Sequence, residues 1–242
     1  MLNYYSIFAP KINMYMKSKL TLLILLVAVF ISCKKTTNVD VKLSTSGKLT
    51  YKLTDDAGKG LANVKVSLFD RTDTYYSNTN ILLETRLTDP SGLADFGDLN
   101  PSNYLLVADS AKVNNVAYIV QEYVQVLTGA VKAKETKVTD YSGTFALTVR
   151  SYNNNQPLKN IGVIMVPSNK FNYSSTTATN LKVADFTGVT NDAGLITFKI
   201  PSNKQYAVYL YNTVTNASYN YNNSVSVQKD ATVNYLMNIY QP

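Results

Sequence analysis

Five short segments of this chain recur in the same order about 100 residues further along. The clearest pair is TDPSGLADF at 88–96 and TNDAGLITF at 190–198. The others pair 47–53 with 143–149, 61–64 with 158–161, 101–103 with 201–203, and 124–126 with 225–227. One structural unit used twice explains this order, so we predict two domains of ordinary size, 47–140 and 141–242.

Apolar residues alternate with polar ones inside the repeated segments. Leu49, Tyr51 and Leu53 alternate in the first copy, and Phe145, Leu147 and Val149 alternate in the second. A period of two indicates half-buried strands, and turn residues recur at short intervals without a sustained helical stripe. We therefore predict an all-β fold of two tandem immunoglobulin-like antiparallel β-sandwiches.

The repeated Asp-Pro-Ser-Gly and Asn-Asp-Ala-Gly segments are turn signals. Glycine at the end of such a turn accepts a positive φ, which other residues adopt only with strain. Phe96 and Phe198 follow the glycines and are predicted to enter the two cores. Replacing Gly92 or Gly194 by valine should then destabilise the corresponding hairpin.

Further segments suggest a family. GLANVKV at 60–66, QPLKNIGV at 156–163 and LNPSNYLLV at 99–107, with the turn segment, resemble the carboxypeptidase regulatory-like or prealbumin-like β-sandwich, a relative of the Cna B-type repeat. The resemblance covers about 47–110 and 143–210. It implies tandem modules of secreted and envelope proteins that space, present or bind, and it is nearly silent on activity.

Some Cna B-type repeats carry a Lys–Asn isopeptide cross-link. Lys48 and Lys52 alternate with the apolar residues of the first strand and are predicted to point outward, and the corresponding segment 144–150 contains no lysine. We therefore expect no such cross-link in either domain.

The N-terminal segment has the pattern of an export signal. Lys17 and Lys19 precede LTLLILLVAVFI at 20–31, which is shorter than the about 20 residues that a transmembrane helix needs and within the range of a signal peptide. We predict a signal peptide over 1–32, whose true start is Met1, Met14 or Met16, followed by a polar tether over 33–46.

The single cysteine follows this segment directly. Phe30-Ile31-Ser32-Cys33 resembles the lipobox of bacterial lipoproteins, which implies cleavage before Cys33 and lipidation of its thiol. The alternative is a cysteine that merely lies near an ordinary cleavage site. The resemblance predicts a lipid-anchored protein of the bacterial cell envelope, at the outer membrane, with the periplasmic or surface face left open.

Composition excludes several classes of function. The chain has no histidine, no tryptophan and one cysteine, so imidazole catalysis, Cys/His zinc sites and an intrachain disulfide are excluded, and no cofactor is expected. Without the lysines of 1–32 the formal net charge falls from +7 to +4, and the basic residues are scattered. A nucleic-acid partner is therefore not expected.

Tyrosines are the first candidate for binding. Tyr209, Tyr211, Tyr219 and Tyr221 flank a polar stretch, and pairing them as a hairpin would put four rings on one face, opposite Val208 and Leu210. Such a face would stack sugar rings or dock a partner, or it would only stabilise the sheet. A polar loop over 70–78, with Tyr75 and Tyr76, is the second candidate.

Acidic residues are the remaining candidates for chemistry. Asp55 with Asp56, or Asp95 with Asp98, would be the carboxylate pair of a glycan-cleaving enzyme, and Asp89, Asp95 and Asp98 would be a weak calcium site. Turn capping accounts for the same residues.

These patterns predict a non-catalytic, lipid-anchored envelope protein whose sandwiches act in adhesion, presentation or an envelope complex. The membrane is one partner, and an envelope protein or a glycan is the other. The alternatives are a glycan-binding accessory lipoprotein that uses the tyrosine face and, third, the glycan-cleaving enzyme.

Overall fold

The computed structural model describes residues 45–74 and 77–240. The segments predicted to be the signal peptide and the tether, as far as residue 44, lie outside the described residues, as do the predicted lipidation site Cys33 and the candidates Tyr75 and Tyr76. Within the described ranges, no helix is both long and apolar enough to cross a bilayer.

Strands up to Lys137 form two sheets. One has the order β4-β1-β7, from β1 (Gly47–Thr54), β4 (Leu93–Leu99) and β7 (Val131–Lys137). The other has the order β3-β2-β5-β6, from β2 (Lys65–Thr74), β3 (Ser77–Leu87), β5 (Ser102–Val113) and β6 (Val116–Val126). Their facing sides enclose one apolar cluster, in which Leu49, Tyr51 and Leu53 are fully buried.

Strands after Asp140 repeat the same arrangement. The order β11-β8-β14 is made by β8 (Ser142–Ser151), β11 (Leu195–Pro201) and β14 (Thr232–Ile239). The order β10-β9-β12-β13 is made by β9 (Ile161–Pro167), β10 (Phe186–Val189), β12 (Tyr206–Asn212) and β13 (Ser218–Val225). Phe145, Leu147 and Val149 are buried in a second apolar cluster, so the all-β, two-sandwich fold is confirmed.

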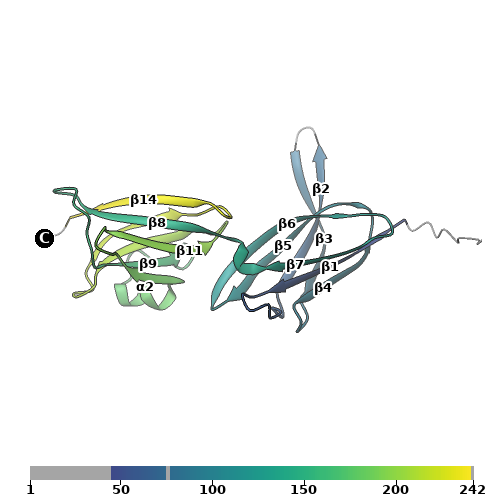
Figure 1. The fold of residues 1–242 in the computed structure, drawn as a ribbon, viewed down its shortest axis with the longest axis horizontal. Helices are drawn as coiled ribbons and strands as arrows, with labels where there is room; N and C mark the ends of the chain where they lie inside the picture. Colours follow the sequence, from purple (N-terminus) through teal and green to yellow (C-terminus); the bar gives the residue numbers. More distant parts are fainter. Residues whose placement is uncertain (1–44, 75–76, 241–242) are drawn as a thin grey trace, which may run out of the picture. The chain divides into compact units, whose positions relative to one another are not determined.

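One feature differs from the predicted antiparallel sandwich. In each sandwich the first strand pairs in parallel with the last, β1 with β7 and β8 with β14 (Figure 1). The first strand is therefore central in a three-stranded sheet, between an antiparallel and a parallel neighbour. The alternation of apolar and polar residues predicts which side chains of a strand face inward. It does not predict whether the neighbouring strand runs parallel or antiparallel.

The repeated turns have the same geometry. Gly92 and Gly194 have φ of 83° and 69°, and the N–H of each donates to the carbonyl of the aspartate or asparagine that opens the turn. The carbonyls of the same glycines accept from Leu53 and Val149 of the first strands, 2.9 and 2.8 Å away. Phe96 is buried and Phe198 packs against its core, as predicted.

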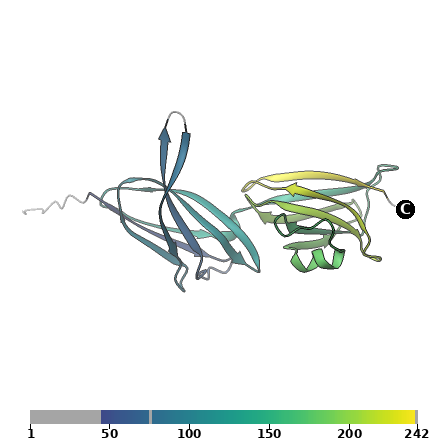
Figure 2. The same cartoon turned by 180° about the vertical axis from the view of Figure 1, so that it is seen from behind.

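The short helix α2 (Thr177–Val183) was not expected from the sequence. Its N-cap is Thr176, whose side chain accepts the N–H of Thr179. The helix covers the side of the β9-β12 pair that faces away from the second core, as Figure 2 shows from behind. The β9–β12 part of that sheet is consequently buried on both sides, and all seven residues of β9 are buried.

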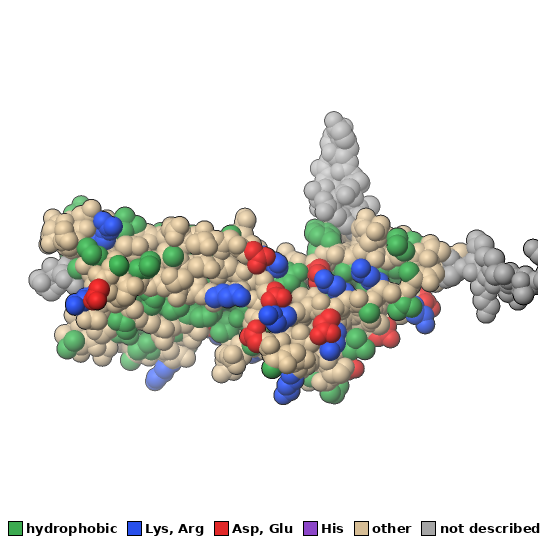
Figure 3. Space-filling view, in the orientation of Figure 1, with side chains coloured by type: hydrophobic (Ala, Val, Ile, Leu, Met, Phe, Trp, Pro, Cys, Tyr) green, Lys and Arg blue, Asp and Glu red, His purple; other side chains and the backbone are tan. Residues whose placement is uncertain are grey.

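Charged side chains are spread over the strands. On the face seen in Figure 3, lysines and arginines lie singly or beside acidic residues. Lys52 pairs with Glu135 and Lys134 with Glu122, at 3.2 and 2.7 Å. These two ion pairs join strands of the first sandwich. The lysine and arginine side chains on the face in Figure 3 do not form a continuous basic stripe.

Candidate functional site

The tyrosine hairpin forms, but its four rings do not share a face. β12 and β13 pair with Tyr209 opposite Tyr221, and Val208 and Leu210 are buried on the inner side as predicted. Tyr219 packs against the inner core as well, because the register shifts between Leu210 and Tyr211. The prediction of four rings on one exposed face is therefore wrong.

Tyr209 lies beneath α2 and is only 4% exposed. Its hydroxyl and that of Thr177 are 3.0 Å apart, and Phe171 packs against the ring with centroids 6.3 Å apart. Tyr211 is partly buried beside the same cluster. Of the four hairpin tyrosines, Tyr221 is the exposed one, at 45%, and its ring packs against Phe171 with centroids 5.5 Å apart.

Residues 70–74 and 77–78 of the predicted loop belong instead to the paired strands β2 and β3. β2 pairs with β3 as far as Thr74 opposite Ser77, while its pairing with β5 ends at Asp70. The end of this hairpin therefore extends past the rest of its sheet (Figure 1).

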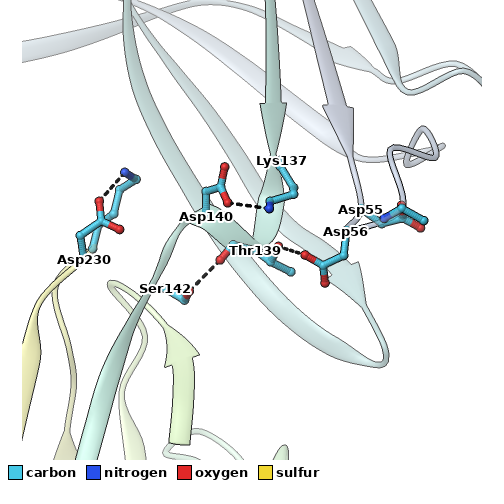
Figure 4. Close-up of polar contacts among 9 residues, drawn as sticks. Asp55, Asp56, Lys137, Thr139, Asp140, Ser142 and Asp230 are labelled. Carbon is cyan, nitrogen blue, oxygen red and sulfur yellow. Dashed lines mark hydrogen bonds and ion pairs between the residues drawn. The ribbon is translucent and has the colours of Figure 1, made fainter.

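Asp55 and Asp56 serve the turn after β1. Asp55 Oδ1 accepts the N–H groups of Ala57 and Lys59, each at 2.9 Å. Asp56 accepts a hydrogen bond from the hydroxyl of Thr139, as Figure 4 shows. The two carboxylates are thus held by different partners: Asp55 caps its own turn, whereas Asp56 links this turn to Thr139, an arrangement unlike that of a catalytic pair.

Asp89, Asp95 and Asp98 do not form a calcium site. Asp89 Oδ1 accepts from the N–H groups of Ser91 and Leu93 and from the Ser91 hydroxyl, and these hydrogen bonds, that of the Ser91 side chain above all, lower the pKa of Asp89. Asp95 Oδ1 accepts the N–H of Gly97. Nowhere in 45–74 or 77–240 do three acidic side chains come close enough to hold a metal ion.

The register of the first and last strands bears on the Lys–Asn cross-link. Lys48 lies beside Val131 and Lys52 beside Glu135, so neither β1 lysine faces an asparagine of β7. In the second sandwich Asn234 lies beside Ala146 and Asn238 beside Arg150. The alternation in β1 agrees with the expectation that Lys48 points outward.

Glu122 of β6, in the other sheet, contacts both strands of the β1–β7 pair. It accepts from the Thr136 hydroxyl at 2.6 Å and pairs with Lys134 at 2.7 Å, and the Tyr51 hydroxyl lies 3.4 Å away. Burial raises the pKa of Tyr51 well above its usual value, so its hydroxyl stays protonated. This cluster ties β6 to β7 and thereby closes one side of the sandwich.

An outward apolar row crosses the four-stranded sheet of the first sandwich. Leu82 of β3, Phe69 of β2, Leu105 of β5 and Tyr123 of β6 are direct neighbours in register. Leu105 alternates with Tyr104 and Leu106, which belong to the core, and so faces away from it. Leu82 and Tyr123 are 55% and 58% exposed at the two ends of the row, whereas Leu105 in its middle is only 6% exposed and Phe69 is half-buried.

This row was missed at the level of sequence because its members lie in four strands. The available signal is YLLV at 104–107, where apolar residues occupy both strand faces. Such a run fits a strand buried on both sides, and 104–106 are indeed buried; among the described residues the outer side of β5 is covered by neighbouring side chains of the sheet, whereas that of β12 is covered by α2. A contiguous outward apolar row is typical of an interaction surface.

Comparisons with known proteins give structural likeness alone. No protein-family model matches the chain, and no curated protein matches it in sequence. The TIE protein of Bacillus anthracis is 15% identical with a TM-score of 0.34, over 81% of this chain and 34% of that one, so this chain spans about a third of its length.

Two pilins are covered almost completely. The minor pilin of Streptococcus agalactiae is 14% identical, with 81% of this chain and 97% of that chain covered and a TM-score of 0.38. The shaft pilin SpaA of Lactobacillus rhamnosus GG is 10% identical, with 82% and 100% covered and a TM-score of 0.31. Likeness at this level does not extend to activity, ligand or partner.

Proposed function

We propose that this chain is a non-catalytic, lipid-anchored protein of the cell envelope, whose two sandwiches form a structural or adhesive module. The observation that carries the proposal is the outward apolar row of Phe69, Leu82, Leu105 and Tyr123. It offers a surface for a protein partner, whereas the acidic residues proposed for chemistry are engaged in turns.

The alternatives have lost the features on which they rested. Glycan binding required an exposed ladder of four rings, and two of those rings, Tyr209 and Tyr219, pack into apolar clusters. Glycan cleavage required two free carboxylates near each other, and Asp55, Asp56 and Asp95 are hydrogen-bonded within their own turns or to Thr139.

The anchor is supported by the sequence around Cys33. Two or three acyl chains on one residue hold a protein on a membrane almost permanently, because each buried methylene contributes about 0.8 kcal/mol. Residues 34–46 then give the sandwiches reach, and Lys34 and Lys35 meet the lipid headgroups.

Lipidation is tested by metabolic labelling with an alkyne fatty acid. The full chain should take up label, and Cys33→Ser should abolish it. A labelled Cys33→Ser chain, or an unlabelled wild-type chain, would refute the anchor.

The interaction surface is tested by photo-cross-linking in intact cells. A photoreactive phenylalanine analogue at Tyr123 should give a discrete cross-linked product, while the same analogue at Tyr173, which is also exposed, should not. Equal yields at the two positions, or no product at Tyr123, would refute the row as the binding surface.

A further inference from the structure

β3 is an edge strand: in the described part of the chain it forms a ladder with β2 alone, although it also lies near β4 of the other sheet. It pairs with β2 alone in the order β3-β2-β5-β6. Edge strands present unpaired N–H and C=O groups, and proteins usually protect them with charges, above all lysine. β7, an edge of the other sheet, carries Lys132, Lys134 and Lys137 in this way.

β3 contains no lysine, and its protection is limited to the bulge near Leu83 and to Glu84 and Arg86, which lie opposite the core residues Leu68 and Val66. Glu84 and Arg86 are its charged residues, and Ile81, Leu82, Leu83 and Leu87 are each between 49% and 64% exposed. Four large aliphatic side chains on one edge strand are costly in water, so the strand has the character of an interface.

The sequence of β3 is complementary to itself. The regular part of the strand begins after a bulge near Leu83 and pairs Glu84 to Leu87 with Leu68 to Lys65 of β2. Two copies placed side by side and antiparallel would be related by a two-fold axis perpendicular to the sheet, which keeps each strand face on its own side. Thr85 can then lie on the axis, opposite Thr85 of the second copy.

In that register every opposed pair is favourable. Glu84 faces Arg86 of the second copy, Arg86 faces its Glu84, and Leu83 faces its Leu87. Moving the register by two residues in either direction, the smallest shift that keeps each side chain on its own face, opposes Glu84 to Glu84 or Arg86 to Arg86, and like charges directly opposite are destabilising. Glu84 and Arg86 already form an ion pair at 2.5 Å within one chain, so their side chains lie on the same face of the strand.

We propose that two copies of this chain pair through β3, antiparallel and with Thr85 on the two-fold axis, to join their four-stranded sheets into one. The added ladder covers residues 83–87, a common strand length, and ends at the bulge. This pairing does not depend on lipidation, and it shares only Leu82 with the apolar row, so its failure leaves the proposed function standing.

A disulfide at the axis tests the pairing. Opposed Cα atoms in an antiparallel pair lie about 4.5–5.5 Å apart, which is within the span of a disulfide. The full-length Thr85→Cys chain, expressed in cells and oxidised in isolated membranes, should form a covalent dimer on a non-reducing gel. The wild-type chain, with Cys33 alone, and Ala133→Cys, an exposed position on the lysine-rich β7 edge, are the controls.

Charge reversal distinguishes a contact between copies from a defect in one chain. Adding Glu84→Arg or Arg86→Glu to Thr85→Cys should abolish the dimer, because like charges would then oppose across the axis. Mixing the two reversed chains under different tags should restore a mixed dimer, in which every opposed pair is again of opposite sign. Each chain keeps its internal repulsion in the mixture, so an effect on folding alone would not be rescued.

Three results would refute the β3 pairing. Thr85→Cys that cross-links no more than Ala133→Cys, or reversed chains that fail to cross-link with each other, would refute the pairing. A product of any other mass would place a different protein on this edge and would also refute it.

Discussion

Thr88 in the first sandwich and Thr190 in the second make the same pair of hydrogen bonds. Thr88 Oγ1 accepts the N–H of Val64 at 2.8 Å and donates to the carbonyl of Leu61 at 2.6 Å. Thr190 Oγ1 accepts from Ile161 at 3.0 Å and donates to Leu158 at 2.7 Å. The internal repeat thus extends to single atoms, since each threonine fixes the entry to the second strand of its sandwich.

Thr88→Val removes this hydroxyl with little change in shape. The buried N–H of Val64 would lose its acceptor, so the free energy of unfolding should fall by about 1–3 kcal/mol. Thr190→Val should have a similar effect on the second sandwich. Urea unfolding followed by tyrosine fluorescence measures both, and Thr197→Val, at an exposed strand position, should change stability by less than about 0.5 kcal/mol.

The turn glycines provide a second test. A Cβ at Gly92 would lie 2.3 Å from the carbonyl oxygen of Leu53, and a Cβ at Gly194 would lie 2.5 Å from that of Val149. Gly58 also has a positive φ, of 77°, but has nothing within 4 Å. Gly58→Ala should therefore show the backbone strain alone, about 1–2 kcal/mol.

Gly92→Ala and Gly194→Ala should lower the melting temperature further than Gly58→Ala, because the backbone must also move. Valine at either position should cost more again. Equal melting temperatures for the three alanine variants would show that the close approach of the turn glycines to the first strands does not affect stability.

The repeat, the strands of each sandwich and the glycine turns could be predicted from the sequence, because they depend on local alternation and on turn chemistry. The direction of β7 and β14 could not be predicted, since a parallel partner and an antiparallel partner require the same alternation. The predicted orientation of Tyr219, on the same face as Tyr209, was wrong for a related reason. A register shift within the β12–β13 pair separates it from Tyr209, and a shift of this kind has no signature in the residues.

α2 explains the remaining error at the candidate site. Its segment, TATNLKV, is too short to show a helical period, and its effect is to bury the outer side of β12. Tyr209 was therefore predicted to be exposed, but it is a core residue because α2, about 30 residues away in sequence, covers it. The outward apolar row depends likewise on four strands meeting in one register.

Stability should fall at alkaline pH through Tyr141. Burial, and then the charge of Glu122, raise the pKa of its hydroxyl to about 12, above the ordinary value of 10.0. A group with a raised pKa contributes its full stability below the unfolded pKa and loses it as the pH rises through the folded pKa. The free energy of unfolding should therefore decline between about pH 10 and pH 12.

Urea titrations at a series of pH values measure this decline. Tyr141→Phe should make it shallower, whereas Tyr173→Phe, at an exposed ring, should leave it unchanged. An identical slope for wild type and Tyr141→Phe would contradict the assignment.

A buried ion pair in the second sandwich tests how much an unpaired buried charge destabilises the fold. Lys204 Nζ lies 2.7 Å from Asp185 Oδ2, and both side chains are largely buried. Lys204→Met would leave the carboxylate with the Tyr206 hydroxyl, at 2.9 Å, but without its cation, and should cost about 3–5 kcal/mol.

Adding Asp185→Asn to Lys204→Met should recover part of this loss, since no uncompensated charge then remains. Lys159, whose pair with Asp192 is exposed, is the matched control, and Lys159→Met should change stability by less than about 1 kcal/mol. Comparable losses at Lys204 and Lys159 in urea unfolding would show that burial of the pair has no effect.

Substitutions at Tyr209 test whether this residue is part of the core or part of a ligand-binding surface. Tyr209→Ala would empty the space beneath α2 and should lower the free energy of unfolding by about 3 kcal/mol or more. Tyr209→Phe keeps the ring and loses the contact with the Thr177 hydroxyl, so it should cost about 1 kcal/mol. Tyr221→Ala, at the exposed neighbour across the strand pair, should cost less than Tyr209→Ala. Urea unfolding gives all three values, and a Tyr209→Ala chain as stable as the wild type would return this residue to the binding candidates.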